Sequence, residues 1–208
     1  MPASETVALF ALASLALIAF PGPSVFYILA RSFEGGRRAG MVSMLGVETG
    51  ALVHVAAAVL GLSALLASSA VAFGVVKYAG AAYLIFLGLG RLRSREAPGL
   101  PPEPEGKVFR QGVLVNVLNP KTALFFLAFL PQFVDPAAGS ASLQAAVLGL
   151  LFVAIAVVSD GAYALVGGTV AERIRRSAAV RRRLDRASGV VLIGLGVVAA
   201  LTGSRRTA

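Results

Sequence analysis

Long apolar stretches constrain the fold of this sequence more than any other feature. A helix needs about 20 mostly apolar residues to cross the ~30 Å hydrocarbon core of a bilayer, because each residue advances it by only ~1.5 Å. Six stretches meet or approach that length: 7–30, 41–66, 69–89, 112–134, 142–170 and 187–203. The sequence therefore predicts an all-α integral membrane protein with about six transmembrane helices. The sixth stretch is the shortest, so a five-span alternative stays open.

The composition agrees with a membrane protein and argues against several classes of function. Apolar residues make up 57% of the chain, the mean hydropathy is +0.83, and 14% of residues are charged, against about 25% in soluble domains. The chain has no cysteine and one histidine, which excludes disulfides, thiolate metal sites and multi-histidine centres. No nucleophile–base pair or cofactor motif can be assembled, so we expect no enzyme activity, catalytic residue, cofactor or metal.

Basic residues cluster in three of the segments between the apolar stretches. The net charge is +9. Three, five and seven of the 19 Lys and Arg residues follow the first, third and fifth stretches. Cytoplasmic loops carry such an excess, which predicts that these three segments are cytoplasmic and that both termini are outside. The charge is explained by topology and by contact with anionic lipid, so the bilayer is an expected partner and nucleic acid is not.

A linker rich in proline divides the chain into two similar halves. We expect one transport domain, 1–208, with a first repeat at 1–90, a cytoplasmic linker at 91–110 and a second repeat at 111–208. Each repeat holds three stretches, so the second would enter the membrane in the inverted orientation. Residues 79–88 and 187–196 match at a constant offset in five positions (Ala, Leu, Ile, Leu and Gly), which favours a repeat.

Two of the stretches are interrupted by helix-breaking residues. Pro21-Gly22-Pro23 interrupts the first and Asn119-Pro120 the fourth. Proline lacks the backbone donor and its ring crowds the preceding turn, so we expect unwound segments. The freed amides and positive helix ends would face an anionic group such as a carboxylate. Asn116 and Asn119 add hydrogen-bonding capacity there.

Three charged residues lie deep inside apolar stretches, close to the expected midplane, where each costs about 2.5–3.5 kcal/mol to insert. They are Glu48, Lys121 and Asp160. A lysine–carboxylate pair that only holds helices together is one interpretation. A single lysine cannot neutralise two carboxylates, however, so the other acid would titrate or meet a cation. His54 shares a small-residue stripe with Gly46, Gly50 and Gly61 and is interpreted as a packed histidine, not a partner of Glu48.

Taken together, several motifs resemble the lysine-exporter (LysE) family, in particular its homoserine/threonine-exporter (RhtB) branch. The resemblance rests on 19–23 (AFPGP), on the stripe from Gly46 to Leu62, on 77–88 (KYAGAAYL…LG), and on the segment from Phe109 to Phe133 that contains NPK and PQF. It covers nearly the whole chain. It implies export of amino acids or their derivatives across the inner membrane of a bacterium, driven by the proton gradient.

The sequence thus leads to a proton-coupled secondary exporter of a small zwitterionic or cationic metabolite, most plainly an amino acid. Its expected transport site comprises Pro21, Gly22, Pro23, Glu48, Asn116, Asn119, Pro120, Lys121 and Asp160, with His54 as an additional candidate. Either Glu48 or Asp160 would carry the proton. An uncoupled channel or facilitator for small cationic or zwitterionic solutes is the alternative, and both a monomer and a homodimer stay open.

Overall fold

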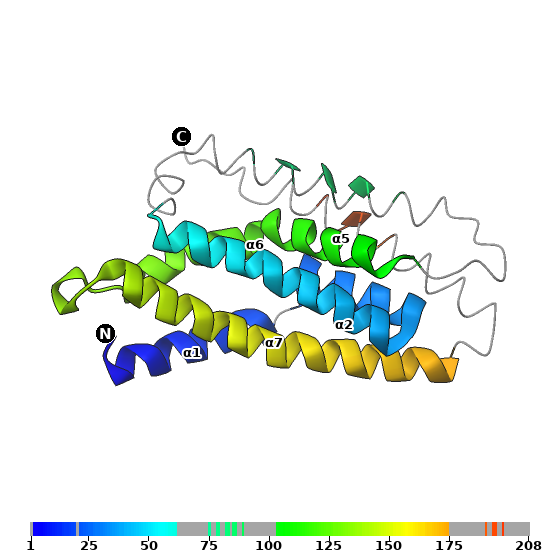
Figure 1. Cartoon of the computed structure of the whole chain (residues 1–208), viewed down its shortest axis with the longest axis horizontal. Coiled ribbons are helices and arrows are strands. Elements are labelled where there is room, and N and C mark those ends of the chain that lie inside the picture. The colour runs from blue at the N-terminus through cyan, green and yellow to red at the C-terminus, as the bar shows by residue number, and fades with distance from the viewer. Residues whose placement is uncertain are drawn as a thin grey trace.

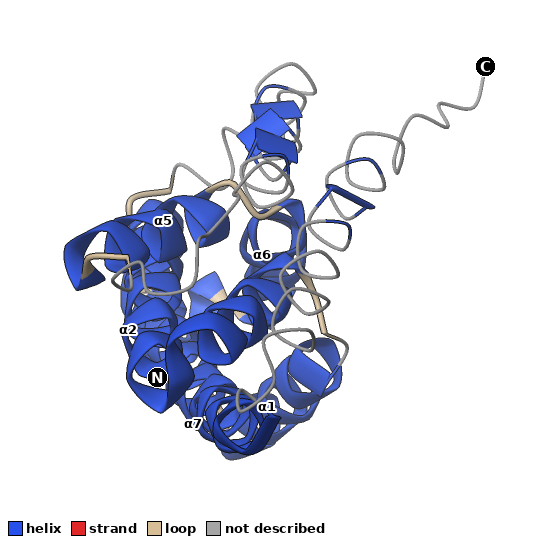
Figure 2. Cartoon of the chain, turned by 90° about the vertical axis from the view of Figure 1, so that its right-hand side faces the viewer, coloured by secondary structure: helices blue, strands red, loops and turns tan. Residues whose placement is uncertain are grey.

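The computed structural model describes residues 2–19, 21–61 and 103–174, together with isolated positions within 75–89 and 190–197. Every regular element among these residues is helical (Figure 2), as the sequence predicts. The third and sixth expected spans, and most of the expected linker, lie outside the described residues.

The described helices come from both halves of the chain (Figure 1). They are α1 (Ser4–Ala19), α2 (Pro23–Val59), α5 (Glu105–Val117), α6 (Pro120–Leu124), the π-helix η1 (Phe125–Phe129), the 3-10 helices η2 (Leu130–Phe133) and η3 (Pro136–Ala138), and α7 (Ala141–Ile174). Among the described residues, α2 and the 141–171 part of α7 are long and apolar enough to cross a bilayer. The pair 105–117 and 120–133, bent by 45°, would make a third broken span.

A glycine folds α2 into a helical hairpin. Gly36 has φ 75° and ψ −165°, a backbone conformation that glycine adopts without the steric cost of a Cβ atom. Its two arms, 23–35 and 37–59, return alongside each other, so Ile28 of the first packs with Met44 and Val47 of the second. The expected loop between residues 30 and 41 is therefore wrong: helix continues almost to the turn on both sides.

Small residues allow the helices around the second arm of α2 to approach closely. A Cβ atom on Gly50 would lie 2.7 Å from the Val113 carbonyl oxygen of α5, and one on Gly149 of α7 would lie 2.8 Å from Val55. Gly46 also packs against α5, so the predicted contact stripe is confirmed at two of its glycines. Gly61 follows the end of α2 with φ +73°, and no atom of the described residues lies within 4 Å of its Cβ position.

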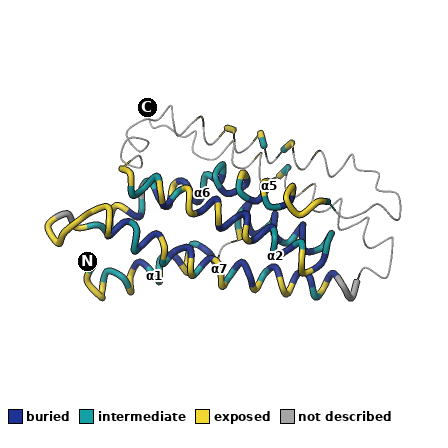
Figure 3. Tube along the Cα trace, in the orientation of Figure 1, coloured by how far each residue is buried: buried dark blue, intermediate teal, exposed yellow. Residues whose placement is uncertain are grey.

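Helix α5 begins earlier than the apolar pattern predicts, at Glu105 and not near residue 112. Its first turns carry charged residues, so the hydropathy of these turns does not predict a helix. They contact α2 near its turn at Gly36. Buried residues concentrate where α2 meets α5 and α7 (Figure 3). Leucines and valines such as Leu12 and Val158 are largely exposed on the outer faces, as suits helices that contact lipid.

Candidate functional site

Two proline-containing helix breaks among the described residues lie side by side. In the first half, Pro21 and Gly22 separate α1 from α2; in the second, residues 118–119 separate α5 from α6. Pro23 and Pro120 each begin the helix that follows, a position where the missing N–H of proline costs no hydrogen bond. The Asn119 Nδ2 atom donates to the Ser24 hydroxyl at 2.9 Å, joining the breaks across 95 positions of sequence.

The two helix starts differ in how their backbone amides are satisfied. At α6, the Asn119 side chain accepts a hydrogen bond from the Lys121 amide at 3.1 Å. At α2 the capping position is Gly22, which provides no side-chain cap. The first amides of α2 therefore remain the positive end of a helix dipole that no capping side chain covers.

Beneath the breaks, one asparagine joins three segments of the chain. Asn116 Oδ1 accepts hydrogen bonds from the Ser24 hydroxyl at 3.1 Å and the Thr122 hydroxyl at 2.9 Å. Its Nδ2 atom donates to the Val47 carbonyl at 2.7 Å. Asn116 and Asn119 thus have protein partners and hold the breaks in register. Sequence reasoning missed Ser24 and Thr122, although each hydroxyl lies one or two positions after a break proline.

Two buried carboxyl groups meet beside the breaks. Glu48 lies on the second arm of α2 and Asp160 on α7, and each residue is 5% exposed. Both side chains line the same cavity and lie near enough to interact, and a hydrogen bond between them would require a proton on one of them because an ionised carboxylate only accepts. The Glu48 Oε2 atom is buried and has no hydrogen-bond partner among the described residues. The sequence placed these acids at corresponding positions but did not predict their contact.

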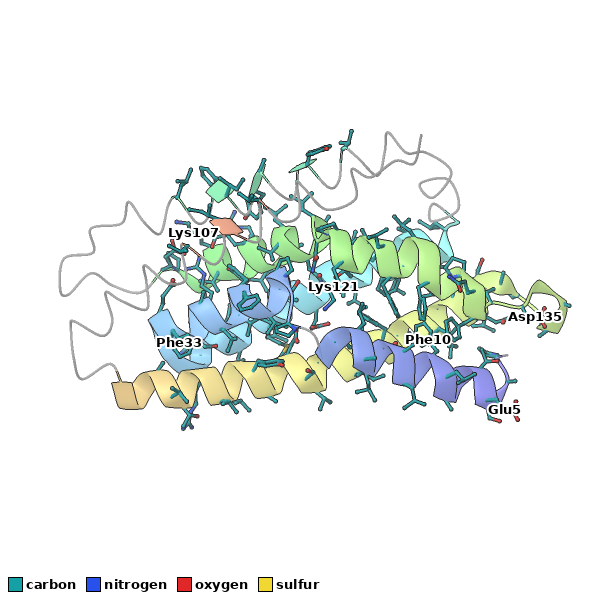
Figure 4. All side chains as sticks on the ribbon, turned by 180° about the vertical axis from the view of Figure 1, so that it is seen from behind. Glu5, Phe10, Phe33, Lys107, Lys121 and Asp135 are labelled. Carbon is teal, nitrogen blue, oxygen red and sulfur yellow. The ribbon has the colours of Figure 1, made fainter. Side chains whose placement is uncertain are left out.

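Lys121 lies in the middle of the bundle (Figure 4) and lines the same cavity as both acids. Its Nζ atom donates to the Leu17 carbonyl at 2.7 Å, one of the last carbonyls of α1, which have no partner within the helix. Its charge also acts on Asp160. Its side chain passes Gly22, where a Cβ atom would be 3.2 Å from the lysine Cδ. A larger residue at Gly22 would press on the lysine.

These groups line a cavity of about 50 Å³. Of the residues that sequence analysis singled out, the structure brings together Gly22, Glu48, Asn116, Asn119, Lys121 and Asp160 around it. The prolines shape the breaks without lining the cavity. A water takes about 30 Å³ in the liquid, so the space has room for one or two waters.

His54 lies away from this cavity. Its Nε2 atom forms a hydrogen bond with the Asn116 carbonyl at 3.0 Å, and its ring stacks on Phe126 with centroids 5.9 Å apart. This is the packed histidine that the sequence favoured.

A second polar cluster surrounds Arg31, which lies two turns after Ser24 on the first arm of α2. The Arg31 side chain is 4% exposed and pairs with Glu34 at 3.0 Å and Glu103 at 2.8 Å. Its Nε atom donates to the Tyr27 hydroxyl at 3.2 Å. Burial alone would raise the pKa of Glu103, but the hydrogen bond from Lys107 and the charge of Arg31 together hold that pKa below its usual value. Sequence analysis assigned Arg31 only to a cytoplasmic loop.

Comparison with known proteins agrees with this architecture. The family described as "LysE type translocator" matches residues 15–203. A homoserine/homoserine lactone efflux protein of Salmonella typhimurium is 30% identical over 92% of this chain and 94% of its own length. An uncharacterized membrane protein of Pseudomonas aeruginosa is 31% identical over 87% of this chain and 88% of its own length. No solved structure matches the chain.

Proposed function

The chain belongs to the LysE-type translocator family, and from this premise we propose that it exports amino acids or small amino-acid derivatives across the inner membrane of a bacterium by exchange for protons. It is accordingly a membrane transporter and not an enzyme. The efflux protein of Salmonella typhimurium, whose name gives homoserine and its lactone as substrates, supports a small amino-acid-like solute. The observation that carries the proposal is the meeting of both helix breaks with the two buried carboxyl groups.

The cavity offers opposite charges to the two ends of an amino acid. The uncapped start of α2 and the Lys121 ammonium form its positive side and suit a carboxylate. Glu48 and Asp160 form its negative side and suit an ammonium group. These groups come from different helices, so a substrate that binds both ends would pull the helices together. A binding site between halves that move relative to each other is the usual arrangement in secondary transporters.

The carboxyl pair supports the coupling to protons. Two adjacent buried carboxylates repel each other, so the empty site retains a proton between them. A substrate ammonium can replace that proton, because it neutralises the same charge. Exchange of one cation for the other keeps the site from crossing the membrane with an uncompensated charge. Because the proton is shared, we assign it to the Glu48–Asp160 pair and not to either residue alone.

The matched breaks also support the two-repeat architecture. We propose six transmembrane helices in two inverted repeats, at 1–90 and 111–208, with both termini outside. In each repeat a proline begins the half-helix that follows the break, and each repeat contributes one carboxyl group to the pair. This equivalence is the arrangement expected of inverted repeats around a midplane site.

Transport by reconstituted protein tests the proposal. Proteoliposomes loaded with labelled homoserine are given either equal pH on both sides or an imposed pH gradient. We expect the pH gradient to drive homoserine transport against its concentration gradient in the wild type. Glu48→Gln and Asp160→Asn should lose this driven transport, while their homoserine exchange at equal pH is reduced less. Glu5→Gln, an exposed carboxyl on α1, is the matched control and should behave as wild type. Downhill flux that ignores the pH gradient would instead identify an uncoupled facilitator.

A further inference from the structure

An apolar groove adjoins the polar cavity between α1 and the second helix break. Its volume is about 360 Å³. The walls come from α1, α6 and η1 and consist of Ala13, Leu17, Lys121, Leu124, Phe125 and Phe129. Among the described residues that line the groove, Lys121 is the one that carries a charge. Of the polar side chains described above, only Lys121 is among the residues that line the groove.

The groove and the cavity share two of their lining residues. Leu17 and Lys121 line both spaces, and the hydrogen bond from Lys121 Nζ to the Leu17 carbonyl, 2.7 Å long, crosses between them. The cavity alone, with about 50 Å³, is too small for an amino acid.

One wall of the groove has unusual backbone geometry. Phe125 and Phe129 lie at the two ends of the π-helix η1, and their rings are 5.2 Å apart. Segments of π-helix are rare and occur frequently at functional sites, because the wider turn changes the direction of its side chains. Here the segment directly follows α6, the short helix that carries Lys121.

We propose that this groove receives the side chain of the transported amino acid, so that the substrate class includes amino acids with apolar side chains of leucine size or larger. Lys121 is the link in this arrangement: its ammonium leaves the Leu17 carbonyl, binds the substrate carboxylate and opens the groove. The substrate ammonium remains with the carboxyl pair, and the apolar side chain packs on Phe125 and Phe129. This inference rests on the proposed export function and specifies its substrate.

Charge and position favour a substrate side chain over a lipid chain as the occupant. The charged residue of the groove, Lys121, also lines the cavity that carries both acids. A molecule that fills both spaces must therefore combine a zwitterionic head with an apolar tail of limited length. An amino acid has that form, whereas a phospholipid chain brings its head group to the bilayer surface.

The experiment reduces the size of the groove and measures substrate preference. Ala13→Trp adds an indole to the groove wall, while Ala16→Trp places the same group on the exposed face of α1. Efflux of leucine and of homoserine is measured for each in proteoliposomes. We expect the wild type and Ala16→Trp to transport both, and Ala13→Trp to lower the leucine-to-homoserine ratio about tenfold or more, as expected when a pocket loses the volume for several carbons.

Other outcomes overturn the inference in distinguishable ways. Homoserine export without any leucine export by the wild type would refute the apolar subsite and leave the proposed function standing. Failure to export either would refute the proposed function itself. An unchanged ratio in Ala13→Trp, with loss of a bound lipid detected by native mass spectrometry, would assign the groove to lipid. Should Ala13→Trp not fold, Phe129→Ala widens the groove and must raise the phenylalanine-to-leucine ratio; an unchanged ratio would refute the inference.

Discussion

A single added methyl group at the contact between α2 and α5 should separate the two helices. Gly112 lies in the middle of α5, where a Cβ atom would be 2.7 Å from the Ser43 carbonyl oxygen and 3.0 Å from the Val47 amide nitrogen. Both neighbours are backbone atoms of α2, so no side chain can rotate away. Gly112→Ala must therefore shift one helix by several tenths of an ångström or more.

The size of the effect follows from two opposing contributions. Overpacking a tight contact costs about 1–3 kcal/mol, and backbone on the opposite side places Gly112→Ala near the upper end. Replacing glycine by alanine inside a helix recovers up to ~1 kcal/mol of helix propensity. The net expectation is a destabilisation of about 1–2 kcal/mol. Gly106, on the same helix, has no atom of the described residues within 4 Å of its Cβ position, so Gly106→Ala should be neutral or slightly stabilising.

Denaturant titration of the two purified variants in the same detergent measures this difference. Far-UV circular dichroism follows the loss of helix, and the free energy of unfolding is compared with that of the wild type. Gly112→Ala should also reduce transport, because Ser43 and Val47 belong to the α2 arm that carries Glu48. Equal stability of Gly112→Ala and Gly106→Ala would show that the two helices are not in backbone contact and would refute the packing described here.

Four further predictions concern the polar residues, the helix breaks and the topology. Arg31→Met should destabilise the protein by about 2 kcal/mol, less than the ~3–5 kcal/mol of a fully buried pair, because Glu103 is 28% exposed; thermal unfolding measures it. The pKa of Glu103 is lower in the folded protein than in the unfolded chain. The ionised Glu103 therefore adds to the free energy of unfolding in full above pH ~4.3, and this addition is lost as the pH falls through the lower folded pKa. The free energies of unfolding of the wild type and Glu103→Gln should thus become equal only in acid. Pro21→Ala combined with Pro120→Ala should leave membrane insertion intact and abolish transport; full transport would reduce both breaks to ordinary kinks. A reporter fused after Ala208 that is active only in the cytoplasm would contradict the outside C-terminus.

The helix breaks show how far sequence reasoning reaches in this protein. Proline removes a donor and crowds the preceding turn wherever it occurs, so the interruptions at Pro21–Pro23 and Asn119-Pro120 could be predicted from local chemistry. That the breaks touch could be predicted only by analogy between the two halves. The hydrogen bond from Asn119 to Ser24 joins residues 95 positions apart, and no local pattern records it.

The boundaries of the helices were harder to predict than their existence. Hydropathy marks where a chain is apolar, but the turn at Gly36 and the charged first turns of α5 are stabilised by contacts between segments. Arg31 illustrates the same difficulty. Its charge predicted a cytoplasmic position, yet partners from two other segments, Glu103 and Gln111, bury it.

The sequence by itself determined that this is an all-helical membrane protein with broken helices and intramembrane charges, because helix length, hydropathy and proline chemistry act within one segment. Only the tertiary structure decided which of those charges meet. Glu48 contacts Asp160, and Lys121 donates to Leu17, because helix packing brings α2, α7 and the end of α1 to the same place. The physical reason is that the cost of a buried charge depends on what surrounds it, and residues distant in the sequence provide those surroundings.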